Sequence, residues 1–132
     1  MNAVADTHAL VWAMTGSWKK LGRRARRIFE SADERRATVY VPSVVLVEVS
    51  ELSRAGRVAL PMPFDRWVEE LSKSGSYIIL DLTADVVARA HGLFDIPERG
   101  DRLIAATAAV HGLPLMTRDE TIATSAGVAS IW

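Results

Sequence analysis

Short apolar runs alternate along this chain with longer stretches in which apolar residues recur every three or four positions. The short runs, some of them rich in β-branched residues, predict strands at residues 2–5, 37–41, 77–80, 115–117 and 128–132. The longer stretches have the period of an α-helix and predict helices at residues 8–14, 21–36, 43–56, 65–73, 83–93 and 101–110. This alternation is typical of an α/β fold, so we expect a mostly parallel sheet of four to five strands flanked by helices.

Capping residues and glycines mark the limits of several of these helices. Ser43 follows Pro42 and is expected to be the N-cap of a helix that stops at Gly56. Thr83 is expected to cap a later helix, and Gly112 to close the apolar helix that begins at residue 101.

The composition excludes several kinds of site. The chain has 132 residues, 49% of them apolar, which is enough for one compact domain that spans residues 1–132. It has no cysteine, so disulfides, thiolate zinc sites and cysteine nucleophiles are excluded. The histidines His8, His91 and His111 lack zinc-ligand spacing and are interpreted as packing or surface residues. Without a recognisable signal peptide or an apolar run approaching the roughly 18–20 residues of a membrane span, we expect a soluble cytoplasmic protein.

The charges are unevenly distributed although the formal net charge is zero. The segment from Trp18 to Arg36 holds eight basic and three acidic residues, a formal charge of +5. Such a segment is often only a solvated helix face, but beside an acidic pocket it would suit an enzyme that acts on a phosphate polymer. The four tryptophans, Trp12 among them, form no regular stacking array and are interpreted as core or dimer-contact residues.

Four carboxylates occupy positions at which the predicted elements would bring them together. Asp6 ends the first strand, Asp119 lies just past another, Asp101 begins a helix, and Glu48 lies in the first turns of the helix after Ser43. In a parallel sheet with right-handed crossovers, strand ends and helix starts share one edge. Four carboxylates in one pocket require protonation or a cation, and oxygen ligands favour Mg²⁺ or Mn²⁺, the ions of phosphate chemistry.

Each acid also has a purely structural interpretation. Asp101 and Asp6 are in positions suited to helix N-caps, and Asp119 is in a position suited to a turn. Glu48 is harder to explain in this way, because it interrupts the apolar segment 44–49, which we expect to be buried nearly all round. A buried carboxylate is costly unless it is paired or bound to a metal.

Five motifs occur in a fixed order along nearly the whole chain. They are Asp6-Thr7-His8-Ala9-Leu10-Val11-Trp12, the Glu48-bearing helix, residues 101–108, Thr117-Arg118-Asp119 and the closing Ile131-Trp132. Each is weak alone. In this order and spacing the chain resembles a PIN-domain ribonuclease, specifically a VapC-like toxin of a type II toxin–antitoxin pair.

The resemblance implies a PIN-like α/β/α sandwich and a Mg²⁺- or Mn²⁺-dependent endoribonuclease that hydrolyses RNA by a metal-activated water. The family's metal-binding acidic quartet corresponds to Asp6, Glu48, Asp101 and Asp119, and its hydroxyl residue to Thr117. The resemblance also implies a homodimer and a cognate VapB-like antitoxin as partners. We expect Asp6 and Asp101 to be direct ligands, with the other two acids completing the pocket.

Residues beside the quartet allow more than one interpretation. Family members often carry an Asp three residues before the acid that corresponds to Asp101, and here that position is Glu98, either a substitute ligand or, as we favour, a solvated loop residue. Arg99, Arg102 and Arg118 flank the acids and are expected either to contact RNA phosphates or to form structural ion pairs.

Two other classes of protein compete with a nuclease. The first is a catalytically silent PIN-like module that binds RNA or protein, which an incomplete acidic quartet would indicate. The second is an aspartyl-phosphate enzyme or a phospho-receiver domain, and both are disfavoured because the first strand is followed by Asp6-Thr7-His8 rather than by paired acids.

Overall fold

Five strands form one sheet in which every neighbouring pair is parallel. The computed structural model describes all 132 residues. Its strands are β1 (Ala3–Ala5), β2 (Val39–Pro42), β3 (Tyr77–Leu80), β4 (Leu115–Met116) and β5 (Ser130–Ile131), in the spatial order β3-β2-β1-β4-β5. The predicted parallel sheet with helices around it is therefore confirmed, with five strands.

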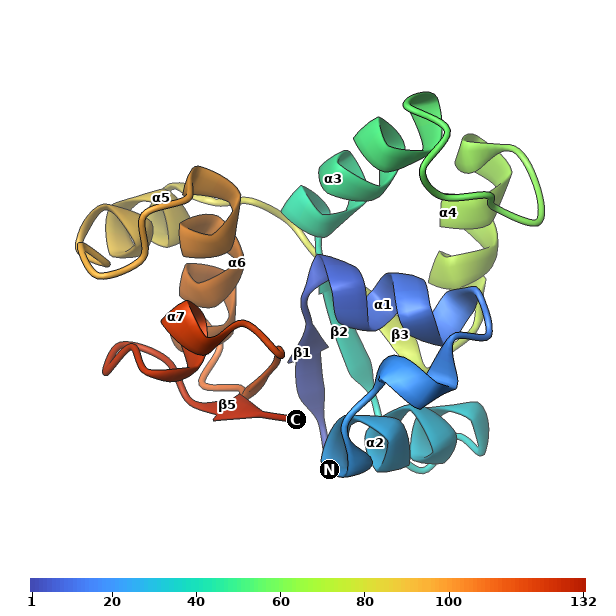
Figure 1. Ribbon diagram of the computed structural model, residues 1–132, viewed down its shortest axis with the longest axis horizontal. Coiled ribbons are helices and arrows are strands. Elements are labelled where there is room, and N and C mark those ends of the chain that lie inside the picture. Colours follow the sequence, from blue (N-terminus) through green and yellow to red (C-terminus); the bar gives the residue numbers. More distant parts are fainter.

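Seven α-helices and one 3₁₀ turn surround the sheet (Figure 1). They are α1 (Thr7–Met14), the turn η1 (Trp18–Lys20), α2 (Arg23–Asp33), α3 (Ser43–Arg54), α4 (Phe64–Lys73), α5 (Ala84–His91), α6 (Arg99–Val110) and α7 (Glu120–Ala123). In Figure 1, α1 to α4 lie on the side of β2 and β3, whereas α5 to α7 lie on the side of β5. None of these helices has the length and apolar character needed to cross a membrane.

The central strand β1 lies between the two halves of the sheet, β2 with β3 and β4 with β5. Its three residues Ala3, Val4 and Ala5 have no exposed surface, because helices cover the sheet on both faces. From β1 the chain builds β2 and β3 on one side and then crosses to β4 and β5 on the other. The strand order thus reverses between β1 and β4, and the carboxyl ends of these strands form the crevice where α/β proteins bind ligands.

One continuous hydrophobic core holds the helices against the sheet. Helix α6 contributes Ile104 and the small residues Ala105, Ala106 and Ala108, none of which is more than 1% exposed. Small side chains on this face let the helix backbone approach the sheet closely, which brings the first turn of α6 to the crevice.

Most predicted element limits agree with the structure to within two or three residues, and the exceptions have local causes. The predicted helix 21–36 is shorter, because Gly22 is the N-cap of α2 and a 3₁₀ turn precedes it. Ser43 is not an N-cap: Pro42 takes that position, and the Ser43 hydroxyl accepts a hydrogen bond from the Leu82 amide at 3.0 Å. The short helix α7 was not predicted, because its four residues are too few for a periodic pattern.

Candidate active site

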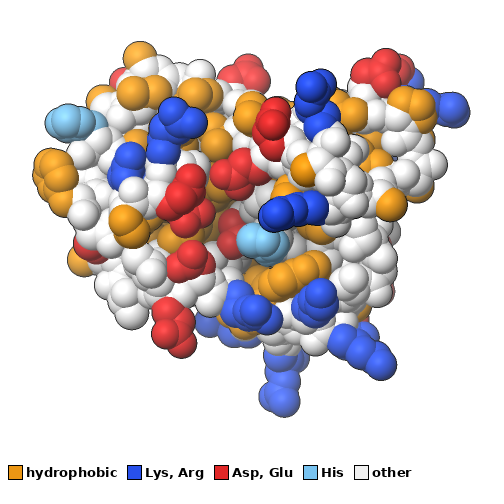
Figure 2. All heavy atoms as spheres, turned by 45° about the horizontal axis from the view of Figure 1, so that its top comes forward, with side chains coloured by type: hydrophobic (Ala, Val, Ile, Leu, Met, Phe, Trp, Pro, Cys, Tyr) orange, Lys and Arg blue, Asp and Glu red, His pale blue; other side chains and the backbone are white.

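All four acids of the predicted quartet line one cavity of about 410 Å³ at the carboxyl edge of the sheet. Asp6, Glu48, Asp101 and Asp119 reach it from β1, α3, α6 and the end of β4. Figure 2 shows the acidic side chains gathered around a hollow in this face, with a histidine beside it. The four acids therefore lie together at one edge of the sheet, as their places in the predicted elements indicated.

Asp6 is the most deeply buried of the four acids, with 8% of its surface exposed. It follows β1 and is the N-cap of α1, where its carboxylate accepts a hydrogen bond from the Ala9 amide at 2.8 Å. Burial raises the pKa of Asp6 above its ordinary value, although hydrogen bonds from Thr117 and Ala9 oppose that rise. Asp6 therefore both caps α1 and lines the cavity.

Asp119 and Thr117 lie side by side after β4. Asp119 is the N-cap of α7 and accepts hydrogen bonds from the amides of Thr121, at 2.8 Å, and Ile122, at 3.3 Å. The buried Thr117 hydroxyl accepts a hydrogen bond from the Asp119 amide at 3.1 Å. Because Thr117 also forms a hydrogen bond to the Asp6 side chain, it links the two acids across the β1–β4 crevice.

The first turn of α6 places Asp101 without using it as a cap. The helix begins two residues earlier than predicted, and Glu98 is its N-cap. Glu98 accepts hydrogen bonds from the amides of Gly100, at 3.0 Å, and Asp101, at 2.7 Å, and these lower its pKa although burial opposes them. Glu98 is exposed and lies outside the helix, as the favoured interpretation as a solvated loop residue predicted, and its carboxylate in addition satisfies the helix terminus.

Glu48 is held by contacts that the sequence reasoning missed. Its carboxylate accepts a hydrogen bond from the buried Thr7 hydroxyl, which comes from the first turn of α1. On the other side it lies against Gly100, where an added Cβ would overlap the carboxylate and would be 3.3 Å from Glu48 Cδ. The clue in the sequence was the glycine directly before Asp101, since only a residue without a side chain leaves this space.

Glu48 does not lie in the nearly fully buried segment that the sequence predicted. Helix α3 is not buried nearly all round, because Val47 is 62% exposed and only Val45 and Val49 are fully buried. Glu48 itself is half-buried. Its position on the cavity depends on Thr7 and Gly100 rather than on an apolar surrounding.

The acids are close enough to affect one another's protonation. Burial, followed by the charges of Glu98, Asp119, Glu48 and Asp6, raises the pKa of Asp101 to about 7. Burial is the largest cause of this rise, and the contribution of four neighbouring carboxylates indicates a pocket of excess negative charge. Such a pocket favours a cation.

The donor set fits a hard divalent cation by its chemistry. The four carboxylates and the Thr117 hydroxyl are all oxygen donors, which Mg²⁺ and Mn²⁺ prefer. In the arrangement seen here, no three acidic or histidine side chains have the spacing of a preformed ion site.

The rim of the cavity carries two residues that the sequence analysis assigned to packing or dimer contacts. His8 and Trp12 lie one helical turn apart on α1, and both line the acidic cavity. Their rings are tilted by 34° with centroids 5.5 Å apart. In the sequence, His8 and Trp12 are four positions apart and come just after Asp6. This spacing puts both side chains on one face of the helix and could have indicated their place at the cavity.

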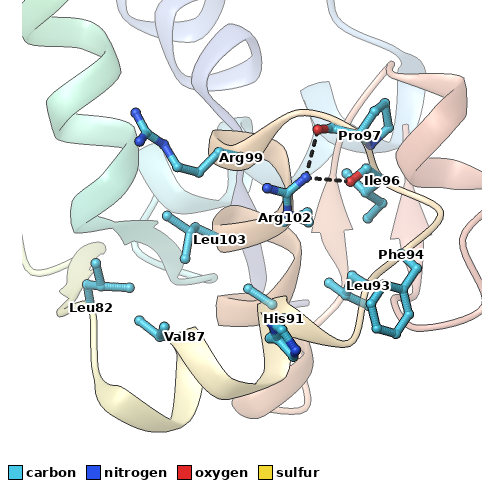
Figure 3. Close-up of a pocket in the computed structure, with 11 residues that line it drawn as sticks. Leu82, Val87, His91, Leu93, Phe94, Ile96, Pro97, Arg99, Arg102 and Leu103 are labelled. Atoms are coloured by element: carbon cyan, nitrogen blue, oxygen red, sulfur yellow. Dashed lines mark hydrogen bonds between the residues drawn. The ribbon is translucent and has the colours of Figure 1, made fainter.

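The three arginines near the quartet have different environments. Arg118 lines the acidic cavity, whereas Arg99 and Arg102 line a neighbouring apolar cavity of about 480 Å³ beside α5 (Figure 3). Arg102 donates hydrogen bonds to the backbone carbonyls of Ile96, at 3.0 Å, and Pro97, at 2.7 Å. Arg102 forms no ion pair and instead braces the loop before α6, so the predicted ion-pair role is wrong, whereas its contact with RNA stays a prediction.

Comparison with known proteins places this architecture in a family. The family model for the PIN domain matches residues 3–127. The ribonuclease VapC22 of Mycobacterium tuberculosis is 29% identical over 119 residues, which cover 89% of this chain and 86% of that protein. The chain therefore belongs to the PIN domain family, as the motifs predicted.

Solved structures with low sequence identity share the fold. VapBC2 from Rickettsia felis, bound to a DNA fragment from its promoter, has a TM-score of 0.70 at 16% identity and covers 99% of this chain and 98% of its own. FitAcB from Neisseria gonorrhoeae has a TM-score of 0.65 at 22% identity, with 100% and 97% coverage. A toxin–antitoxin complex from Klebsiella pneumoniae has a TM-score of 0.63 at 23% identity, with 96% and 95% coverage.

Proposed function

We propose that this chain is a VapC-like toxin, an endoribonuclease that hydrolyses RNA phosphodiester bonds with the help of Mg²⁺ or Mn²⁺. The observation that carries the proposal is the single cavity lined by Asp6, Glu48, Asp101 and Asp119, at the crevice where the strand order reverses. The similarity to the ribonuclease VapC22 over most of both chains supports RNA as the substrate.

The four carboxylates are proposed to hold the divalent ion, with Asp6 and Asp101 as direct ligands and Asp119 and Glu48 completing the pocket. When bound, the ion would supply Lewis-acid assistance for attack of water on phosphorus. Thr7 and Thr117 would keep their neighbouring carboxylates oriented through the hydrogen bonds described above. The pKa of Asp101 is raised by burial and by the charges of the neighbouring acids, and because the ion offsets these charges, its binding should stabilise the folded protein.

A small cognate antitoxin of the VapB type is proposed as the inhibitor of this nuclease. The support is that solved structures of the same fold are described as VapBC and other toxin–antitoxin complexes. A homodimer and a cytoplasmic location, where RNA and the antitoxin are present, complete the proposal. Sedimentation of the purified chain tests the oligomeric state directly.

The decisive experiment compares the native chain with Asp6→Asn on total RNA, in Mg²⁺, in Mn²⁺ and in chelator. Asparagine preserves the N-cap of α1 but removes the charge, so the variant should fold. Glu70→Gln is the matched control, because Glu70 is an exposed acid on α4 outside the cavity. Discrete metal-dependent fragments from the native chain and the control, but not from Asp6→Asn, are expected. Cleavage that persists in Asp6→Asn would refute the site, and a folded chain that binds RNA without cutting it would indicate the catalytically silent module.

A further inference from the structure

Two cations lie against Trp12 at the edge of the acidic cavity. The guanidinium carbon of Arg118 is 5.1 Å from the centroid of the Trp12 ring, and Lys20 Nζ is 5.7 Å from it. Both distances are within the range of cation–π attraction, which holds a cation near an aromatic ring. Trp12 and Arg118 also line the cavity, so Arg118 lies beside the carboxylates, whereas Lys20 contacts the same ring from outside the cavity.

Neither cation is neutralised by a carboxylate. The ion pairs in the structure are Arg26–Glu30, Arg36–Glu34 and Lys73–Glu69, and all of them are exposed pairs outside the cavity. Lys20 and Arg118 are both exposed and belong to none of these pairs. An acidic cavity so close by would ordinarily attract them into ion pairs, yet they lie over the tryptophan instead. Their charges remain available to an anion from solvent.

The C-terminal residue fixes the basic helix beside this group. The backbone carbonyl of Trp132 accepts a hydrogen bond from the Arg24 amide at 3.3 Å, and its ring meets the Trp12 ring edge-on with centroids 5.9 Å apart. Gly22 permits this approach, since an added Cβ would be only 2.7 Å from Cγ of Trp132. The basic start of α2 is therefore anchored next to Trp12, and Figure 2 shows lysine and arginine side chains around the apolar surface beside the acidic hollow.

We propose that Trp12 positions Lys20 and Arg118 as a phosphate clamp, which binds the backbone of single-stranded RNA beside the scissile phosphate. The inference rests on the proposed ribonuclease function and names how its substrate is held. A cavity of four carboxylates repels a polyanion, so the phosphates that flank the cleaved one require cations at its rim. Trp12 is a positioning residue, because it acts on the RNA through the two cations held near its ring.

Salt-dependent binding tests the clamp without any cleavage. A fluorescent single-stranded RNA is titrated with the Asp6→Asn chain over a series of salt concentrations, with and without Lys20→Ala plus Arg118→Ala. Each phosphate contact on a single strand contributes a slope of about 0.7 in log affinity against log salt, so the double variant should lower the slope by about 1.4. The matched control is Arg66→Ala plus Arg89→Ala, which removes two exposed, unpaired cations from α4 and α5 and should leave the slope unchanged.

Variants of Trp12 separate positioning from folding. In the cleaving chain, Trp12→Leu should raise KM about tenfold with kcat little changed, whereas Trp12→Phe should restore much of the lost affinity because it keeps an aromatic ring. A merely structural role for Trp12 would lower the melting temperature and leave the salt slope intact.

The outcomes distinguish the clamp from the nuclease. If the double variant keeps the native salt slope while the native chain cleaves RNA, the clamp is wrong and the proposed function stands. If no metal supports cleavage but the slope falls by about 1.4, the nuclease is wrong, and Lys20 and Arg118 hold RNA phosphates in a chain that binds RNA without cutting it. Absence of RNA binding by the Asp6→Asn chain at low salt overturns the clamp.

Discussion

Gly100 lies against the carboxylate of Glu48, so that a side chain at this position requires the carboxylate of Glu48 to move. A Cβ at this position would overlap one oxygen of Glu48 and would also be 3.1 Å from a carboxylate oxygen of Glu98. This contact joins the acid contributed by α3 to the helix that carries Asp101. The position of the Glu48 carboxylate therefore depends on the absence of a side chain at residue 100.

Gly100→Ala should therefore reduce RNA cleavage strongly while the chain stays folded. The extra methyl group displaces Glu48 from the cavity, and a displacement on the order of 1 Å in a catalytic group can cost about a hundredfold in rate. Initial cleavage rates and the melting temperature are the measurements. Gly92→Ala is the matched control, because Gly92 ends α5 and its nearest neighbour would be 3.6 Å from the new Cβ. Native cleavage by Gly100→Ala would contradict the role of this contact.

Thr7→Val should weaken metal-dependent cleavage by about tenfold, as expected for a hydrogen-bonding partner of a metal ligand. Valine has nearly the same shape but lacks the hydroxyl that holds the Glu48 carboxylate. Thr7→Ser keeps the hydroxyl and should cleave RNA almost as fast as the native chain. The readout is the Mg²⁺ concentration that gives half-maximal cleavage, which should rise for valine alone. If Thr7→Val and Thr7→Ser need the same Mg²⁺ concentration for half-maximal cleavage, the hydrogen bond from Thr7 to Glu48 does not contribute to metal binding.

Asp101→Asn should abolish cleavage and at the same time stabilise the metal-free protein at pH 8. Burial and the neighbouring acids raise the pKa of Asp101 from 3.8 to about 7 in the folded chain. Ionisation is thus harder in the folded than in the unfolded state, and the native chain loses stability as the pH rises from about 4 to about 7. Thermal melts in chelator should show the variant more stable at pH 8, with the difference much reduced at pH 5. A lower melting temperature for the variant than for the native chain at pH 8 would show that the ionised Asp101 does not destabilise the folded protein.

Arg102→Ala should destabilise the protein and leave the salt dependence of RNA binding unchanged. Its guanidinium donates to the carbonyls of Ile96 and Pro97, and hydrogen bonds from a charged group each contribute about 1.5–3 kcal/mol. Urea unfolding measures the loss, and Arg89→Ala on the exposed face of α5 provides the control for removal of a charge alone. A reduced salt slope for Arg102→Ala would instead assign this residue to the RNA.

The sequence by itself determined the fold class, the parallel sheet and the four acids. Strand and helix differ in the period of their apolar positions, and parallel connections place strand ends and helix starts at one edge, so Asp6, Asp101 and Asp119 could be assigned there without coordinates. The motif order was equally informative, because residues 3–127 match the PIN domain family.

Only the tertiary structure decided which neighbours hold these acids and what surrounds them. The contacts of Glu48 with Thr7 and Gly100, the capping role of Glu98 and the cations over Trp12 join residues from different elements. Local periodicity carries no information about such pairs, since their distance depends on how closely helices pack on the sheet. The same reason explains why Arg102 and Arg118, equally close to an acid in sequence, have different environments: one braces a loop, and the other lies at the mouth of the cavity.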